Sequence, residues 1–430
     1  MLKKSIAFLI IVVLLTSIAG CTSTTTTTTL ATSASQGTTQ SQAQSSTQAS
    51  TQATTQATTQ ASKEPILLGQ YTYLTGINAN LGIAINNATK LAIKQINEAG
   101  GVNGRQLALV TYDDQAKPEL TVQMVTRMLE VDKVTAIVAS ALTASVVAVY
   151  PMTEAAKTIL VSGGNGTSWT NIGAKYLFRS SSSNAFSLPT LVETIVKFGF
   201  SKVGVLAINS EYGTNGIEVI TPLFKEAGIT ATYEKYTYGD TDYTGQLQKL
   251  FRDGAETILV YTSNIADCGN IFKQIRRMGY SNYVFSIESA NGKEARDIGG
   301  NDTNGVVFTA PAVIPDDPND ALTEKEKKFL NDYVKEYGAM PIADVAYRAF
   351  DGTQLIFEAL KTCTDINDKE SIRAAFVKIK DFQGLEGVYD FTDESGDGLR
   401  TSGMYIHYGG KVLNLEKYIA DHDVTKPFVG

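Results

Sequence analysis

Short apolar runs alternate with amphipathic stretches along most of the chain after residue 62. The runs are rich in Val, Ile, Leu and Tyr and are bounded by turn residues, which is typical of strands buried in a parallel sheet. Eight of them stand out, at residues 66–71, 107–112, 135–139, 158–161, 203–208, 257–261, 283–287 and 306–309. We expect each run to form a strand.

The stretches between the runs carry helix signals. In residues 85–99 the apolar positions recur every three or four residues, and Gly100 and Gly101 follow as a left-handed helix end. Pro118 suits the first turn of the next helix. Strands that alternate with such helices predict βαβ units, an α/β fold and mostly parallel sheets. Three short segments, 389–391, 404–408 and 412–415, are separated by turn residues and predict antiparallel additions.

The amino terminus has the pattern of a cleaved export signal. Lys3 and Lys4 precede an apolar run at residues 6–15, which is about half the ~20 residues that a spanning helix needs. The run ends in Ile18-Ala19-Gly20-Cys21, which resembles the lipobox of prokaryotic lipoproteins. We therefore expect a signal peptide at residues 1–20 and lipidation of Cys21. An ordinary cleavage site with an incidental cysteine is the alternative.

Residues 22–62 form a segment of very biased composition. It contains no charged and no aromatic residue, and 32 of its 41 residues are Ser, Thr or Gln. Such a segment buries too little apolar area to offset the entropy lost on ordering. We expect residues 21–62 to be a lipid-anchored, disordered tether, although a Gln/Ser-rich prion-like tract has a similar composition. Residues 63–430 are too many for one typical core, so we expect two lobes there.

Charge and residue usage exclude several functions. The formal net charge is −7, from 37 basic and 44 acidic residues without basic clusters, which argues against nucleic-acid binding. The two histidines, His407 and His422, lack metal-ligand spacing, so we expect no metal site and no cofactor. There is no GxSxG motif and no histidine suited to a triad, which argues against a hydrolase. Cys268 and Cys363 lie in predicted helices and are expected to be free thiols.

Polar residues follow the predicted strands, where ligands of open parallel sheets bind. Two of these loops are rich in hydroxyls and glycines, which suit an anion such as a carboxylate. A second group of loops offers an aromatic ring and a carboxylate. The candidates in the first group are Thr143, Ser145, Gly164, Asn165 and Thr167, and those in the second are Tyr212, Asn264 and Glu288. Helix capping by Thr143 and Ser145, a capping aromatic at Tyr212 and a solvated loop carboxylate at Glu288 are the structural alternatives.

Several segments, taken together and in order, resemble one family. They are Leu74-Thr75-Gly76 with Gly82, the segment from Ile96 to Gly104, Tyr112-Asp113-Asp114, Phe178-Arg179, Tyr212-Gly213 and Glu288. The chain resembles a type I periplasmic binding protein of the leucine/isoleucine/valine-binding family, the lipoprotein-anchored receptors of amino-acid ABC importers. The resemblance covers nearly all of residues 63–430.

The resemblance implies a fold of two Rossmann-like lobes with central, mostly parallel sheets, joined by three crossovers. We place the crossovers near residues 180–184, 309–313 and 389–391. The N-terminal lobe would then comprise residues 63–183 plus 312–389. The C-terminal lobe would comprise residues 184–311 plus 390–430.

The resemblance also implies roles for the candidate residues. Thr143 and the loop from Gly164 to Thr167 would bind the ligand α-carboxylate, Glu288 would bind the α-ammonium, and Tyr212 would pack on the ligand. Three positions depart from the family pattern. Leu81, the ninth residue expected to contact the ligand, stands where many relatives carry an aromatic residue. Asn264 stands where some carry Tyr, and the second loop's hydroxyl is shifted to Thr167.

The sequence therefore predicts a binding protein and not an enzyme. It would capture an amino acid, branched-chain or otherwise apolar, and deliver it to the membrane permease of an ABC importer. We expect a monomer held by its lipid at the outer face of the cytoplasmic membrane. The alternative is a receptor or sensor of the same fold for amides, urea-like solutes or aromatic acids.

Overall fold

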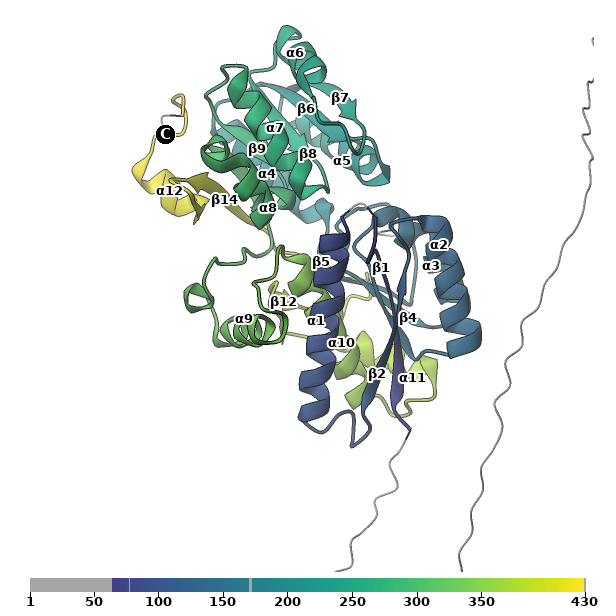
Figure 1. Ribbon diagram of the computed structural model, residues 1–430. Coiled ribbons are helices and arrows are strands. Elements are labelled where there is room, and N and C mark those ends of the chain that lie inside the picture. Colours follow the sequence, from purple (N-terminus) through teal and green to yellow (C-terminus); the bar gives the residue numbers. More distant parts are fainter. Residues whose placement is uncertain (1–63, 77, 170–171, 429–430) are drawn as a thin grey trace, which may run out of the picture. The chain divides into compact units, whose positions relative to one another are not determined.

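The computed structural model describes residues 64–76, 78–169 and 172–428 (Figure 1). The predicted signal peptide, Cys21 and the predicted tether lie outside the described residues. Within the described ranges, no helix combines the length and the apolar character that crossing a bilayer requires.

Two large sheets organise the chain. The first has six strands, all paired in parallel, in the order β13-β5-β4-β3-β1-β2. The strands are β1 (Ile66–Thr72), β2 (Leu107–Asp113), β3 (Ala136–Ala139), β4 (Ile159–Ser162), β5 (Leu177–Ser182) and β13 (Asp397–Leu399). Alternate residues of a strand face opposite sides of the sheet and pack into different hydrophobic cores. Ala136 and Val138 pack toward helices on one face, whereas Ile137 and Ala139 pack toward helices on the other.

The second sheet has seven strands in the order β15-β14-β10-β9-β8-β6-β7. They are β6 (Lys202–Ile208), β7 (Thr230–Tyr236), β8 (Thr257–Tyr261), β9 (Val284–Ser286), β10 (Val306–Ala310), β14 (Gly403–Tyr408) and β15 (Lys411–Asn414). The last two strands pair antiparallel and the other five pair in parallel. A small antiparallel pair, β11 (Phe382–Gln383) and β12 (Val388–Tyr389), stands apart from both sheets.

Helices cover both faces of each sheet. Those packed with the first sheet are α1 (Ala79–Glu98), α10 (Val345–Thr362) and α11 (Lys369–Phe376) on one face, and α2 (Pro118–Arg127) and α3 (Thr143–Ala155) on the other (Figure 1). Those packed with the second are α4 (Asn184–Lys197), α5 (Glu211–Glu226) and α12 (Leu415–Asp421) on one face, and α6 (Thr244–Arg252), α7 (Ile265–Arg277) and α8 (Lys293–Gly299) on the other. Helix α9 (Glu324–Tyr337) packs beside α1. The predicted α/β class with mostly parallel sheets is confirmed.

All eight predicted runs are strands, and each end differs from the predicted one by at most one residue. Pro118 opens α2 as expected, and Gly100 and Gly101 have positive φ after α1. The antiparallel additions β14 and β15 are confirmed, but Leu415 begins α12 instead of ending a strand. The strands β5, β7 and β13 were not among the eight runs.

The third crossover lies later than predicted. Strand β13 pairs with β5, so residues 397–399 belong to the first sheet, and the chain passes to the second sheet only between Leu399 and Gly403. The prediction near residues 389–391, and with it the assignment of residues 390–399 to the C-terminal lobe, is therefore wrong. The other two passages follow β5 and β10, as expected. The division into two lobes remains a proposal, with residues 390–399 assigned to the N-terminal lobe.

A buried ion pair fixes β13 to β5. Arg179 Nε lies 2.6 Å from Asp397 Oδ1, and the two side chains are 0% and 5% exposed. The guanidinium also donates to the carbonyl oxygens of Gly164 and Gly166, and it lies 3.5 Å from the ring centroid of Trp169. The pair therefore joins the carboxyl-terminal part of the chain to a loop that follows β4.

We predict that Asp397→Ala lowers the free energy of unfolding by about 3–5 kcal/mol, because it leaves the Arg179 charge buried without its carboxylate. Urea unfolding followed by circular dichroism measures this. The matched control is Asp393→Ala, which removes an exposed partner of Arg400 and should change the same quantity by less than about 1 kcal/mol. Equal effects of the two substitutions would contradict the role given to the buried pair.

Candidate functional site

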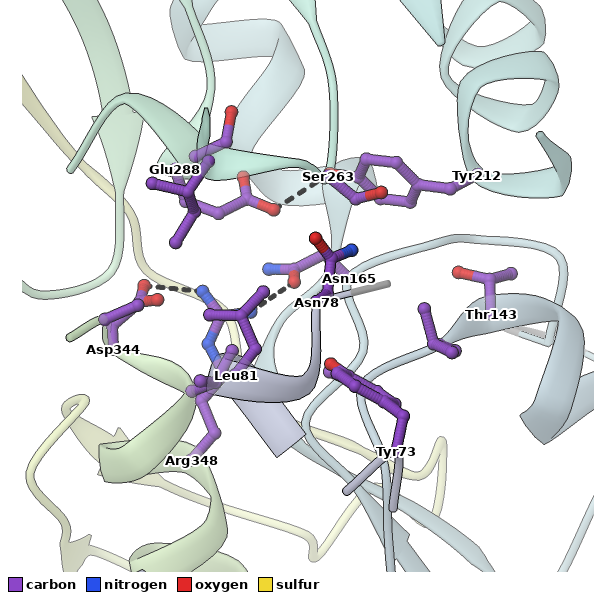
Figure 2. Close-up of a pocket in the computed structure, with 16 residues that line it drawn as sticks. Tyr73, Asn78, Leu81, Thr143, Asn165, Tyr212, Ser263, Glu288, Asp344 and Arg348 are labelled. Carbon is purple, nitrogen blue, oxygen red and sulfur yellow. Dashed lines mark hydrogen bonds and ion pairs between the residues drawn. The ribbon is translucent and has the colours of Figure 1, made fainter. Parts of the chain in front are cut away.

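A cavity of about 70 Å³ lies between the carboxyl-end loops of the two sheets (Figure 2). Residues of the first sheet and its helices form one wall, and residues of the second sheet form the other. The lining residues labelled in Figure 2 are Tyr73, Asn78, Leu81, Thr143, Asn165, Tyr212, Ser263, Glu288, Asp344 and Arg348. A second cavity of about 390 Å³ adjoins it, and the two share lining residues that include Asn78, Thr143 and Tyr212.

Thr143 presents a hydroxyl to the cavity at the amino terminus of α3. Its side chain is buried, and Oγ1 has no hydrogen-bond partner. Figure 2 shows this oxygen turned toward the interior of the cavity. The loop after β4 approaches closely because it carries a glycine: a Cβ on Gly166 would lie 2.5 Å from Thr143 Oγ1. An unpartnered hydroxyl at a helix amino terminus is suited to an anionic group.

Tyr212 and Glu288 form the opposite wall. Ser210 caps α5 by accepting a hydrogen bond from the backbone N–H of Gly213, which places Tyr212 in the first turn. The Tyr212 ring stacks on Tyr261 with centroids 5.1 Å apart. Its hydroxyl donates to Glu288 Oε1 over 2.8 Å. Glu288 opens the short 3₁₀ helix η2 (Glu288–Asn291) directly after β9.

The environment of Glu288 makes its ionised form costly. Removal from water raises the pKa of the carboxyl above 4.5, the Arg348 guanidinium lowers it, and the Asp344 carboxyl raises it again, with a net increase. Burial and Glu288 raise the pKa of Tyr212, so its phenol stays protonated and donates. A positive group placed in the cavity would favour the carboxylate form of Glu288.

Arg348 lies at the floor of the cavity and holds the loop after β4. It donates through Nη2 to Asp344 Oδ2 over 2.5 Å, and through Nη1 to Asn165 Oδ1 and to the Gly163 carbonyl oxygen. The Nδ2 group of Asn165 donates in turn to the Ser182 carbonyl oxygen over 2.9 Å. Gly163 permits this contact, because a Cβ there would lie 2.9 Å from Arg348 Cβ. Asn165 therefore orients Arg348 while lining the cavity.

The structure brings five of the nine predicted ligand residues into this cavity: Leu81, Thr143, Asn165, Tyr212 and Glu288. The other four do not line it. Ser145 lies in the neighbouring cavity, with its hydroxyl 2.9 Å from Thr121 Oγ1. The Gly164 carbonyl oxygen accepts from Arg179 and Ser181, and the Asn264 side chain caps α7. Both the backbone N–H and the hydroxyl of Thr167 donate to Asn215 Oδ1.

Thr167 belongs to a set of polar contacts that join the two walls beside the cavity. Its two hydrogen bonds to Asn215 are 2.7 and 3.0 Å long. Ser168 donates to Glu211 over 3.1 Å. On another side, Asn78 Nδ2 donates to the Tyr238 hydroxyl over 3.2 Å. These contacts exist only when the loops of the two sheets are close together.

Sequence analysis missed Asp344 and Arg348 among the lining residues. Their spacing of four resembles an exposed helix pair, yet the two residues are 3% and 2% exposed. The neighbouring residues carry a signal that could have found them, because an apolar stretch predicts burial. Ala346, Tyr347, Ala349 and Phe350 are all apolar and buried. Among the described residues, no group of three or more His, Cys, Asp or Glu side chains could hold a metal ion.

Comparisons with known proteins agree with one another. A family model described as periplasmic binding protein matches residues 65–408. The chain is 24% identical over 327 residues to the leucine-, isoleucine-, valine-, threonine- and alanine-binding protein of Pseudomonas aeruginosa, a match that covers 75% of this chain and 84% of that protein.

Two solved structures illustrate the likeness of fold. One is the branched-chain amino acid transporter substrate binding protein LivJ from Streptococcus pneumoniae in complex with isoleucine, with TM-score 0.71, 25% identity, and coverage of 81% of this chain and 97% of that one. The other is a solute binding protein of an ABC transporter from Rhodopseudomonas palustris BisB5 in complex with 3,4-dihydroxy benzoic acid. It has TM-score 0.71 and 24% identity, and the match covers 81% of this chain and 95% of that one.

We define the stability gap as the free energy of unfolding of the Glu288→Gln variant minus that of the wild type. We predict that this gap increases as pH rises. Below 4.5 the carboxyl is protonated in both the folded and the unfolded state, so it contributes no pH dependence. Above that pH the unfolded chain ionises while the folded chain retains its proton, which disfavours folding. Urea unfolding of ligand-free protein at pH 4.5, 6 and 7.5 measures the gap. A gap that narrows as pH rises would contradict the assigned environment.

Proposed function

This chain belongs to the periplasmic binding protein family, as its sequence motifs predicted, and we propose that it captures an amino acid between two closing lobes. The observation that carries the proposal is the pairing of Thr143 and Glu288 across one cavity. An unpartnered hydroxyl lies on the wall of the first sheet, and a carboxylate lies on the wall of the second. A zwitterion has groups that match both.

The ligand α-carboxylate would accept a hydrogen bond from Thr143 Oγ1 beside the amino terminus of α3. The α-ammonium would lie against Glu288, whose carboxyl group also accepts a hydrogen bond from the Tyr212 hydroxyl. Leu81, Ile265 and Val345 supply apolar surface for a side chain. An apolar amino acid, branched-chain or similar, fits these groups, and no covalent chemistry is required.

Closure follows from the position of these groups on two sheets. A ligand that touches Thr143 and Glu288 at once favours the closed arrangement, because only there does it make both contacts. The contacts of Thr167 with Asn215 and of Asn78 with Tyr238 add to the closed arrangement and are lost when the walls part. Ligand affinity therefore includes the free energy of closing.

The wider role rests on the sequence and the family. We propose that the protein is a monomeric, extracytoplasmic lipoprotein that delivers its ligand to the membrane permease of an ABC importer. The amino-terminal segment would anchor it through Cys21 at the outer face of the cytoplasmic membrane, with residues 22–62 as a tether.

A second candidate is a receptor of the same fold for amides, urea-like solutes or aromatic acids. Leucine at position 81, in place of an aromatic residue, favours a pocket that differs from that of amino-acid receptors. A thermal-shift screen of amino acids, amides and aromatic acids separates the two candidates. A ligand at 100 times its dissociation constant adds ~2.7 kcal/mol to the free energy of unfolding.

We predict that Glu288→Gln weakens binding of the amino acid selected by the screen by ~2 to 5 kcal/mol, which is about 30-fold to several-thousand-fold in affinity, because the ammonium loses its charged partner. Titration calorimetry measures the change. Glu256→Gln is the control, because Glu256 is an exposed carboxylate just before β8 that lines neither cavity. Unchanged affinity of the Glu288→Gln variant would remove this residue from the site.

A further inference from the structure

A second carboxylate faces the same cavity from the opposite wall. Asp344 precedes the first turn of α10 and is buried in the cavity lining. Helix α10 packs on α1 and on the strands of the first sheet, whereas Glu288 follows β9 of the second sheet. In Figure 2, Asp344 and Glu288 lie at one end of the cavity and Thr143 lies at the other.

The charges around that end do not balance. Arg348 is the positively charged residue of the cavity lining, and several acidic side chains interact with it. It pairs with Asp344 at 2.5 Å and approaches Glu386 at 3.5 Å, and its charge also acts on Glu288. Burial raises the pKa of the Asp344 carboxyl although Arg348 opposes this, and the Asp344 charge raises the pKa of Glu288. One guanidinium therefore faces three carboxyl groups, of which Asp344 and Glu386 are buried and Glu288 is half-buried.

We infer that Asp344 and Glu288 together hold the cationic nitrogen of the ligand, one carboxylate from each wall. A primary ammonium has three N–H donors, so it can donate to both carboxylates at once. The ligand class is then a primary amine, either a zwitterion whose carboxylate meets Thr143 or an amine that carries a net positive charge. This inference rests on the proposed function and adds a residue that the family resemblance did not supply.

The arrangement also couples the cation to closure. Burial makes the charged form of each carboxyl costly, so Glu288 retains its proton when no cation is present. A cation between the two groups stabilises both charged forms, and it contacts both walls only when they are close together. Binding of the cation and closure therefore favour one another through the same pair of residues.

The test compares two substitutions beside Arg348. Asp344→Asn removes the carboxylate that lines the cavity. Glu386→Gln removes a buried carboxylate that contacts the same guanidinium but does not line the cavity. The probes are the standard L-amino acids and, separately, the primary amines from ethylamine to hexylamine. Titration calorimetry measures the dissociation constant of each probe that binds.

We predict that Asp344→Asn weakens the binding of these probes by about 10-fold or more, while Glu386→Gln changes it by less than about 3-fold. Equal losses in both variants would mean that Asp344 acts through Arg348, and unchanged binding in Asp344→Asn would mean that it does not touch the cation. Either result overturns the inference and leaves the proposed function standing. Amines that bind with this dependence while no amino acid binds would reject the proposed function and retain the inference. A wild type that binds neither class rejects both.

A double variant guards against misfolding of the single one. Asp344→Asn combined with Arg348→Gln removes both members of the buried pair, so the guanidinium is not left without its aspartate and the net charge of the cavity is unchanged. Direct contact predicts that amine affinity still falls by about 10-fold or more. Wild-type affinity in a folded double variant would overturn the inference.

Discussion

The cost of ionising a carboxyl group away from water is the constraint on which this site depends. Glu288 lies at the end of a buried strand, with the Tyr212 hydroxyl as a donor and a second acid, Asp344, across the cavity. Neither neighbour neutralises it, and Arg348 is already paired with Asp344 and with Asn165. A cation from solution is what this geometry lacks, and binding one both stabilises the charge and draws the two walls together.

Two buried guanidinium groups hold the loop that follows β4. Arg179 holds the carbonyl oxygens of Gly164 and Gly166, and Arg348 holds the Gly163 carbonyl oxygen and the Asn165 side chain. The loop between them is therefore fixed from two sides by groups that are themselves neutralised by Asp397 and Asp344. The loop's own polar atoms are used in this way, which leaves the hydroxyl of Thr143 free for a ligand.

Sequence patterns predicted some of the lining residues that follow strands and missed others, both beside a strand, as at Tyr73, and at the start of α10, as at Asp344. Thr143, Tyr212 and Glu288 were found because strand ends of parallel sheets converge on one edge. Asp344 was not predicted because a charged pair spaced by four residues usually lies on the surface of a helix. Only the packing of α10 against α1 shows that Asp344 is buried. Strand β13 escaped because three residues with one apolar side chain give no periodic signal, and its pairing depends on the distant Arg179. The lobes could be predicted from chain length and alternation, but the third crossover could not.

The most direct test of the central claim is a crystal structure with the amino acid that binds most tightly. The account predicts the ligand nitrogen within about 3.2 Å of a carboxylate oxygen of Glu288, and a ligand carboxylate oxygen within about 3.0 Å of Thr143 Oγ1. A ligand bound in the reverse direction, or one seated outside this cavity with Glu288 turned toward bulk water, would contradict it.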